Sequence, residues 1–406
     1  MSEDIDNERS RSDTVGRRPF LATTGAAVVG AVGLAGCAGN GDDGNGNGNG
    51  DGNGDSPEPT SVADAEPLGS PVTAEGISWD ELGDLEGTIT VYSGRTPDQI
   101  DLVFERLENE YDGLTINRDY DDNDAQVNQL IEEGDATPAD IFYSQDPGAL
   151  GAVTDEGLTQ ALPGDIVDTV RGSYRHPDGL WTGVSGRVRS VVYNEDRLDE
   201  TPFDSWDELP TDISEYATDD RFEGIIATRP NSGTFRGFIQ AMVQLEGEEA
   251  TRQWVSDFMD QDPQLFSSGT DHAVAINRGG DDDPIVGLGN SYYAARIVNE
   301  DSDAPVRVTF TEGDAGALFS VAGVAAMNNV DDPELVAEFA RHLLAVDGQE
   351  FMMDDNGEFP VVDGVDYVGP LPGPDELNSP DFDLSSFDME LQGARELLED
   401  EGMLPL

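Results

Sequence analysis

The chain has 406 residues, and its 85 acidic residues against 21 basic ones, all of them arginine, give a formal net charge of −64 at pH 7. Nucleic-acid binding is excluded, because contacts with phosphates require clustered positive charge. Self-repulsion of this size strains a compact fold unless salt screens it, and the Debye length falls to about 3 Å at 1 M salt, so the composition predicts a halophilic protein.

Residues 1–36 have the pattern of an export signal. Arg17 and Arg18 precede an apolar run rich in glycine and alanine, from Ala22 to Ala35, and Cys37 follows almost at once. This order resembles a twin-arginine signal that ends in a lipobox, so we expect cleavage before Cys37 and its lipidation. The alternative is a buried thiol in a short transmembrane helix, but a membrane span needs about 20 apolar residues.

Residues 37–85 are expected to form a flexible acidic linker, because glycine, asparagine, aspartate, serine and proline dominate most of this stretch. No later apolar run is long enough to cross a bilayer. We therefore expect a folded body at the extracellular face of the cell membrane, in contact with the membrane only through its lipid anchor.

The body starts with strands that alternate with amphipathic helices, which predicts a parallel α/β sheet. We expect Leu102, Val103, Phe104 and Leu107 to face the core from the first helix. The expected elements are a strand at Thr88–Tyr92, a helix at Gln99–Tyr111, a strand at Leu114–Asn117, a helix through Val127 and Leu130, and a strand at Ala139–Tyr143.

A second α/β region follows from about Val191. It is long enough, with the first region, for two domains of ordinary size. Its expected elements are strands near Val191–Asn194 and Ile225–Thr228, helices near Arg236–Leu245 and Thr251–Met259, a small apolar stretch from Gly316 to Met327, and a helix at Pro333–Leu344.

Two adjacent tyrosines, Tyr292 and Tyr293, directly follow Gly289, Asn290 and Ser291. A phenolate oxygen is a hard donor suited to Fe³⁺, and the charge of the ion lowers the phenol pKa from its usual value of about 10. Neighbouring residues on a strand point to opposite faces, so both phenols can meet one metal only where the strand ends. The alternative is two aromatic side chains buried at a strand–helix junction.

The stretch from Arg229 to Phe235 opens a helix after the strand at Ile225–Thr228. Ser232 can cap this helix, and the free N–H groups of the first turn together with the helix dipole favour an anion. The alternative is that Ser232 only caps the helix and no anion binds. The arginines of the stretches 93–96 and 185–189 also favour anionic groups, whereas solvated surface arginines are the simpler interpretation.

Taken in order, these stretches resemble the ferric-ion-binding proteins of bacterial and archaeal ABC importers, within the type II periplasmic-binding-protein superfamily. The resemblance covers Thr88 to the C-terminus. It is carried by Val91–Arg95, Pro138–Ser144, Val184–Asn194, Pro230–Phe235, Asn290–Tyr293 and Asp347–Phe351. It implies an α/β fold of two lobes joined by hinge strands, with lobe 1 at 86–188 plus 316–360 and lobe 2 at 189–315 plus 361–406.

The resemblance also implies a binding site for Fe³⁺, with Tyr292 and Tyr293 as phenolate ligands. A phosphate or carbonate would complete the iron shell. The residues implied for this anion are Ser232, Gly233, Thr234 and Asn290, with the guanidinium groups of Arg95 and Arg187 facing it. The implied partners are a permease and its ATPase on other chains, and the protein is expected to be monomeric.

Three positions depart from the family patterns. Thr96 stands where many relatives carry histidine, and Gln145 stands where they carry glutamate. Phe235 replaces a tyrosine that another branch uses. First-lobe contacts through Thr96, Gln145, Asp146 or Tyr143 therefore stay open, as does a chelated iron in place of the bare ion.

An enzyme is not predicted. The chain has three histidines and one cysteine, without a spacing typical of zinc sites, and it carries neither a nucleophile elbow nor a Walker-type phosphate loop. Two alternatives remain: the same clamp with an organic anion, an organophosphorus compound or thiamine as cargo, and an acidic cell-surface protein with a structural role only.

Overall fold

The computed structural model describes residues 77–373, 377–380, 382, 384 and 391–404. The export signal and Cys37 lie outside the described residues, as does the linker up to residue 76. The folded body begins before the expected residue 86, because Trp79 and Leu85 are buried. The indole of Trp79 donates a hydrogen bond of 2.8 Å to the carbonyl oxygen of His342 and so fixes this segment to the body.

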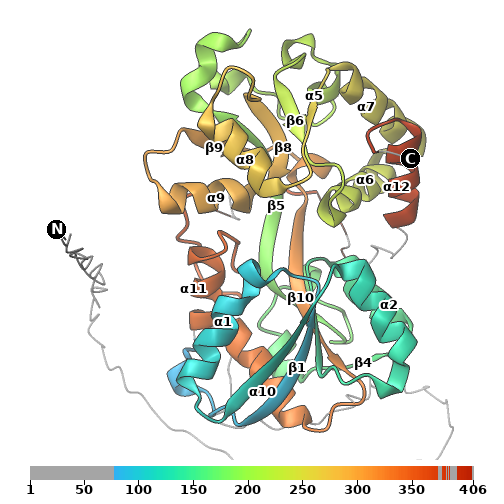
Figure 1. Ribbon diagram of the computed structural model, residues 1–406, viewed down its shortest axis with the longest axis vertical. Coiled ribbons are helices and arrows are strands. Elements are labelled where there is room, and N and C mark those ends of the chain that lie inside the picture. The colour runs from blue at the N-terminus through green and yellow to red at the C-terminus, as the bar shows by residue number, and fades with distance from the viewer. Residues whose placement is uncertain (1–76, 374–376, 381, 383, 385–390, 405–406) are drawn as a thin grey trace, which may run out of the picture. The chain divides into compact units, whose positions relative to one another are not determined.

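The described part of the chain forms two lobes around one hydrogen-bonded sheet (Figure 1). The strand order is β2-β1-β3-β10-β5-β8-β6-β7, with β4 beside β10 and β9 beside β5. Two long strands, β5 (Thr182–Asn194) and β10 (Phe319–Met327), run through the junction of the lobes. The predicted α/β class and the two-lobed arrangement with hinge strands are confirmed.

The first lobe holds the N-terminal part of the described chain and returns to it after β10. Its strands are β1 (Gly87–Ser93), β2 (Leu114–Tyr120), β3 (Ile141–Ser144) and β4 (Thr159–Gln160). Its helices are α1 (Pro97–Glu110), α2 (Asn123–Glu133), α3 (Pro147–Asp155), α4 (Gly164–Val167), α10 (Pro333–Leu344) and α11 (Val346–Asp354).

The second lobe holds the middle of the chain and the C-terminal helix. Its strands are β6 (Ile226–Thr228), β7 (Gln264–Leu265), β8 (Val286–Asn290) and β9 (Val306–Thr309). Its helices are α5 (Glu215–Thr218), α6 (Gly233–Glu246), α7 (Glu248–Asp260), α8 (Gly269–Arg278), α9 (Ser291–Glu300) and α12 (Leu391–Asp400). Helix α12 packs beside α6 (Figure 1).

The expectation that Leu102 faces the core is wrong, since its side chain is 54% exposed. Ile100, Val103, Phe104 and Leu107 are fully buried and already form a stripe at the i, i+3, i+4, i+7 spacing. Leu102 lies outside that stripe and points to solvent.

The sheet changes partners within β5. Residues 182–188 pair with β10, and residues 189–194 pair with β8 and β9. The change falls next to the predicted lobe boundary at 188/189; the boundaries themselves stay a prediction. Because both lobes share β5, side chains of this strand lie where the lobes meet.

Candidate functional site

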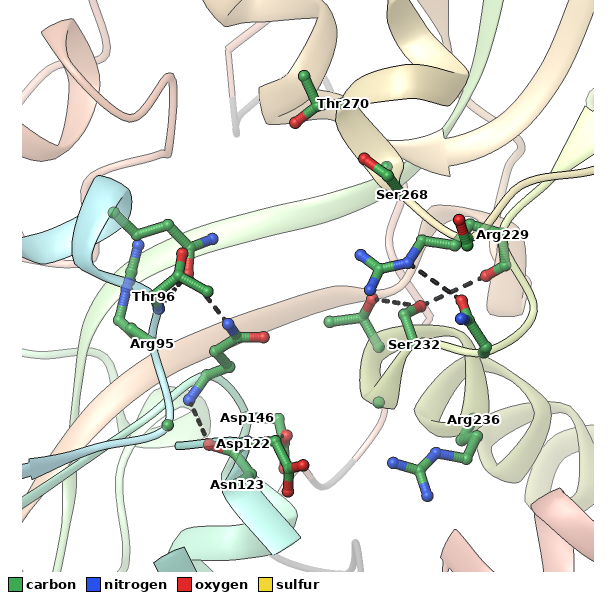
Figure 2. A pocket seen from close by; sticks show the side chains of 18 of the residues that line it. Arg95, Thr96, Asp122, Asn123, Asp146, Arg229, Ser232, Arg236, Ser268 and Thr270 are labelled. Carbon is green, nitrogen blue, oxygen red and sulfur yellow. Dashed lines mark hydrogen bonds between the residues drawn. The ribbon is translucent and has the colours of Figure 1, made fainter. Parts of the chain in front are cut away.

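A cleft of about 930 Å³ lies between the lobes, and each lobe forms one of its walls. Figure 2 shows Arg95, Thr96, Asp122 and Asn123 of the first lobe across from Arg229 and Ser232 of the second. The further lining residues include Asp98, Gln99, Asp121, Asp124, Gln145, Asp146, Arg236, Ser268, Gly269, Thr270, Tyr292, Tyr293, Arg296 and Arg395.

Helix N-termini border the cleft on both sides. Helices α1, α2 and α3 begin there from the first lobe, and α6, α8 and α9 begin there from the second. Each N-terminus carries partial positive charge and unpaired N–H groups. Aspartates cap α2 and α3 on the first wall, whereas serines cap α6 and α8 on the second. Asp271 lies in the first turn of α8, but the first turns of α6 and α9 carry no acidic residue, so the dipoles of these two helices favour negative groups at the second wall.

Tyr292 and Tyr293 lie on the first turn of α9, directly after β8 ends. Their ring centroids are 4.1 Å apart at an interplanar angle of 38°, and both side chains line the cleft. The prediction that they follow a strand end is confirmed, because the helix begins at Ser291 and turns both rings to one side. Tyr292 is buried, and Tyr293 packs against Gly269, where a Cβ would come within 2.3 Å of the ring.

Burial raises the pKa of Tyr292 well above its usual value of 10, and the neighbouring phenol of Tyr293 raises it further. The positive charge of Arg187 acts in the opposite direction. The guanidinium of Arg229 donates a hydrogen bond of 3.4 Å to the phenol oxygen of Tyr293. Without a cation, Tyr292 therefore keeps its proton at neutral pH.

The predicted anion-binding residues of the second lobe lie together at the start of α6. The hydroxyl of Ser232 accepts a hydrogen bond of 3.1 Å from the N–H of Phe235 and lies 3.2 Å from the hydroxyl of Thr234. The amide of Asn290 donates to Thr234 Oγ1 over 3.1 Å. Gly233 lines the same part of the cleft. These contacts link the N-terminus of α6 to the start of α9.

Arg95 lines the cleft, but its guanidinium is held by first-lobe and hinge residues. It donates to both carboxylate oxygens of Glu358, at 2.9 and 3.0 Å, and to Ser185 at 3.2 Å. Both charged side chains are at most 2% exposed. The carboxylate of Glu358 therefore already neutralises the guanidinium that was expected to face the anion.

Arg187 is also buried, and its Nε and Nη2 atoms have no hydrogen-bond partner. With Gly233, Thr234 and Asn290 it lines a second, smaller pocket beside the cleft. Arg189 lines that pocket as well; burial lowers its pKa to about 9, and the nearby Tyr292 raises it.

The first-lobe residues bind mainly to one another. The N–H of Thr96 donates to Gln99 Oε1 over 3.1 Å, and the Gln145 amide donates to the same oxygen over 3.0 Å. Asp146 caps α3 through the N–H of Ala149. Tyr143 is fully buried, and burial raises its pKa. Thr96, Gln145 and Asp146 reach the cleft, whereas Tyr143 does not line it.

The sequence reasoning missed the charged rims of the cleft. Arg229, Arg236, Arg296 and Arg395 line the second-lobe side, and Asp98, Asp121, Asp122 and Asp124 line the first-lobe side. Two ion pairs cross between the lobes, Arg236–Asp124 at 3.2 Å and Arg296–Asp98 at 3.8 Å. The available signal was the position of the four aspartates at or just before the starts of α1 and α2, but 85 acidic residues hide such a pattern.

A cluster of protein metal ligands and a membrane-spanning helix are both absent from the described residues. No group of three or more His, Cys, Asp or Glu side chains in that part of the chain could hold a metal ion. None of the described helices has the length and apolar character needed to cross a membrane.

Comparisons with known proteins agree with this architecture. A family model described as bacterial extracellular solute-binding protein matches residues 136–384. The chain is 28% identical to iron uptake protein A2 of Synechocystis over 263 residues, which cover 60% of this chain and 71% of the relative. It is 26% identical to the major ferric iron-binding protein of Neisseria meningitidis over 320 residues, covering 78% of this chain and 93% of the relative.

Solved structures show the same fold. Iron-bound HitA from Pseudomonas aeruginosa superposes with a TM-score of 0.70 at 23% identity, covering 78% of this chain and 99% of that one. The Trichodesmium protein IdiA (FutA), solved in complex with iron and citrate ligands, gives a TM-score of 0.62 at 24% identity, with coverage of 78% and 99%.

Proposed function

Because the chain belongs to the family of bacterial extracellular solute-binding proteins, we propose that it captures ferric iron outside the cell and delivers it to the permease of an ABC importer. An ATPase on another chain would drive the import. Relatives named for ferric iron binding or iron uptake support this cargo. The role of this family is to bind solutes for transport, so we assign the chain no catalytic role.

The tyrosine pair carries the proposal. Two phenols whose ring centroids lie 4.1 Å apart at the start of α9, open to the cleft, provide two hard oxygen donors on one side of a metal ion. Fe³⁺ is the cation that best replaces the proton of a phenol whose pKa is raised by burial, because its own charge stabilises the phenolate.

A phosphate or carbonate is proposed as the co-ligand, at the N-terminus of α6. Ser232, Gly233 and Thr234 present their N–H groups or hydroxyls there, and Asn290 is fixed to Thr234 beside the tyrosines. Arg187 supports the anion from the hinge, whereas Arg95 acts through its pair with Glu358 rather than through free guanidinium groups. On the first wall, Thr96 and Gln145 would add contacts when the lobes close.

The transport role follows the two-lobed form. Iron binds to the second lobe and shifts the population toward a closed clamp, through rotation about β5 and β10. We further propose that a monomer is tethered to the outer face of the membrane by a lipid on Cys37, after export by the twin-arginine route. High salt would screen the large negative charge.

One observation favours a second candidate cargo, an organic anion in the same clamp. Four arginines line the second-lobe rim, and of these Arg229 forms no ion pair with a carboxylate of the described residues. A relative of the same fold, AfuA from Actinobacillus pleuropneumoniae, was solved with fructose-6-phosphate, with a TM-score of 0.62. Such a ligand would use the arginines and leave the tyrosines without a metal.

A visible absorption spectrum tests the cargo. The mature protein in multimolar salt is titrated with ferric citrate and phosphate, and a band between about 400 and 500 nm is expected from charge transfer between phenolate and Fe³⁺. The double variant Tyr292→Phe/Tyr293→Phe should lose the band.

Tyr120→Phe is the matched control, because Tyr120 lines the opposite wall and donates its hydroxyl to Asp101. The control should keep the band. A folded wild-type protein without a band would remove the tyrosine–iron site and favour the organic anion.

A further inference from the structure

Four polar residues form a strip on one face of the hinge sheet, beside the cleft. Ser320 of β10 is the cross-strand partner of Arg187, and Asn290 of β8 is the partner of Arg189. Directly opposed residues of antiparallel strands lie on the same face, and so do residues two apart on one strand. The two arginines of β5 therefore stand side by side between a hydroxyl and an amide.

Both guanidinium groups are taken out of water without a carboxylate partner. Arg187 is 4% exposed and Arg189 is 7% exposed. Nε and Nη2 of Arg187 and Nη2 of Arg189 are buried and have no hydrogen-bond partner. Buried guanidinium donors are expected to have hydrogen-bond partners, because an unpaired buried charge is strongly destabilising.

The groups that face the arginines do not supply the missing charge. Arg189 lies over the rings of Phe235 and Phe238, with its guanidinium carbon 5.0 and 4.9 Å from their centroids. Those rings stabilise a cation only partly. His272 also lies near Arg189, and it is neutral at neutral pH because burial and the charge of Arg189 lower its pKa to about 4.

Asp146 is the one carboxylate that lines the same pocket among the described residues. Its oxygens accept hydrogen bonds from the N–H of Ala149 and the amide of Asn123, and it forms no ion pair with either arginine. The pocket therefore keeps a local excess of positive charge in a chain of net charge −64.

The unpaired groups line a small, partly open space of about 30 Å³ between the hinge and α6. We call it the arginine pocket, lined by Arg187, Arg189, Thr234, Asn290 and Ser320, with Phe238 on its apolar side. A space needs about 10–15 Å³ to hold one water molecule, so this one has room for a water molecule or an ion of similar size. A monatomic anion fits such a space, whereas a tetrahedral oxyanion is larger.

We propose that the arginine pocket binds a single halide ion, such as chloride, at a site distinct from the cleft. Charge-assisted hydrogen bonds from the two guanidinium groups hold the ion, and Asn290 and Ser320 flank it. The halide would stabilise the junction of the lobes, since β5, β8 and β10 all contribute to the pocket. The inference uses neither Tyr292 nor Tyr293, but Arg187, Thr234 and Asn290 are also proposed to hold the co-ligand anion. The halide site is therefore tested on protein free of iron, phosphate and carbonate.

Chloride NMR tests the site on iron-free protein. The excess ³⁵Cl line width is measured in sodium chloride at constant ionic strength, with bromide as competitor. Wild-type protein should broaden the line, and bromide should reverse the effect. Arg187→Gln and Arg189→Met should each weaken chloride binding by about tenfold or more, as expected for lost hydrogen bonds to a charged group.

Arg278→Met is the matched control, because Arg278 is 65% exposed and pairs with Asp283 far from the pocket lining. It should broaden the line as the wild type does. Equal broadening in all four proteins would mean an adventitious ion only and would overturn the proposal. Circular dichroism checks that each variant is folded.

A second measurement covers the case in which the arginine variants do not fold. Crystals of the wild type grown in sodium bromide should give an anomalous peak between Arg187 and Arg189, and Ser320→Val, which fills the pocket with methyl groups, should remove it. A water molecule in place of the peak would overturn the proposal. Tyr292→Phe/Tyr293→Phe should keep the peak, so failure of the iron site and failure of the halide site are distinguishable.

Discussion

The two walls of the cleft differ in how their polar groups are used. On the second-lobe wall, the phenols of Tyr292 and Tyr293 and the N–H groups at the start of α6 are directed to the cleft. On the first-lobe wall, Gln99, Gln145 and Asn123 bind one another or the backbone around them. The second wall therefore provides the donors for capture, and the first wall provides a pre-formed surface that closes over the ligand.

The buried arginines show the same difference. Arg95 is neutralised by Glu358 within 3.0 Å, whereas Arg187 and Arg189, on the strand that leads into the second lobe, have no such partner. An arginine with a fixed carboxylate stabilises the fold, and an arginine without one is available to an anion. This difference between paired and unpaired arginines can be tested by substitution, and the largest expected effect is on stability.

Replacement of Glu358 by glutamine should give the largest loss of stability. It leaves the guanidinium of Arg95 buried with no carboxylate, and breaking a buried ion pair from one side costs about 3–5 kcal/mol. The free energy of unfolding from urea titration measures this. Glu399→Gln is the control, because its partner Arg395 is 54% exposed, and such a pair contributes about 0.5 kcal/mol or less. Equal losses in both variants would show that Arg95 does not depend on Glu358.

The next largest effect is the pH dependence of iron affinity, which should depend on the second wall and not on the first. Burial raises the pKa of Tyr292 well above 10, so its phenol is protonated at neutral pH and must release the proton to bind Fe³⁺. Affinity should therefore fall as the pH falls, by about tenfold per pH unit for the proton that Tyr292 releases.

Competition against a chelator of known protonation, between pH 6 and 8, measures this slope. Tyr292→Phe should flatten the slope, because the buried phenol that must release its proton is then absent. Tyr120→Phe, on the opposite wall, should leave the slope unchanged. A pH-independent affinity in the wild type would contradict binding through phenolates.

Much of the fold was predictable because its signals are local. The alternation of strands and helices, the stripe of α1 and the strand end before Tyr292 depend on residues close in the chain, and the structure has helix α9 starting at Ser291. The error at Leu102 arose because neighbouring residues of a helix point in different directions, and the buried stripe at the i, i+3, i+4, i+7 spacing starts at Ile100 and leaves Leu102 out.

The roles of the arginines were not predictable because they depend on distant partners. Glu358 lies 263 positions from Arg95, and nothing near either residue indicates that the two meet. The alternation along β5 places Arg187 and Arg189 on one face, but their burial depends on α6 and β10, which pack over them. Long-range packing therefore decides which arginines are free for ligands, and single motifs do not contain that information.

The smallest expected effect concerns the ion pairs that cross the cleft. Asp124 of the first lobe pairs with Arg236 of the second at 3.2 Å, with 51% of the aspartate side chain exposed. Asp124→Asn should weaken ligand binding by about fivefold or less, because an exposed pair contributes about 1 kcal/mol at most. The effect should shrink further in multimolar salt, where the Debye length falls to about 3 Å or less and exposed charges are screened.

Asp168→Asn is the matched control, because Asp168 is also mostly exposed, at 68%, and pairs with Arg175 at 2.9 Å within the first lobe, away from the cleft. The control should leave ligand affinity unchanged at every salt concentration. An equal loss in both variants would mean that general charge, and not contact between the walls, sets the affinity. A loss confined to Asp124→Asn at low salt would show that the first wall contributes by closing on the second, which is the role assigned to it by its internally bonded polar groups.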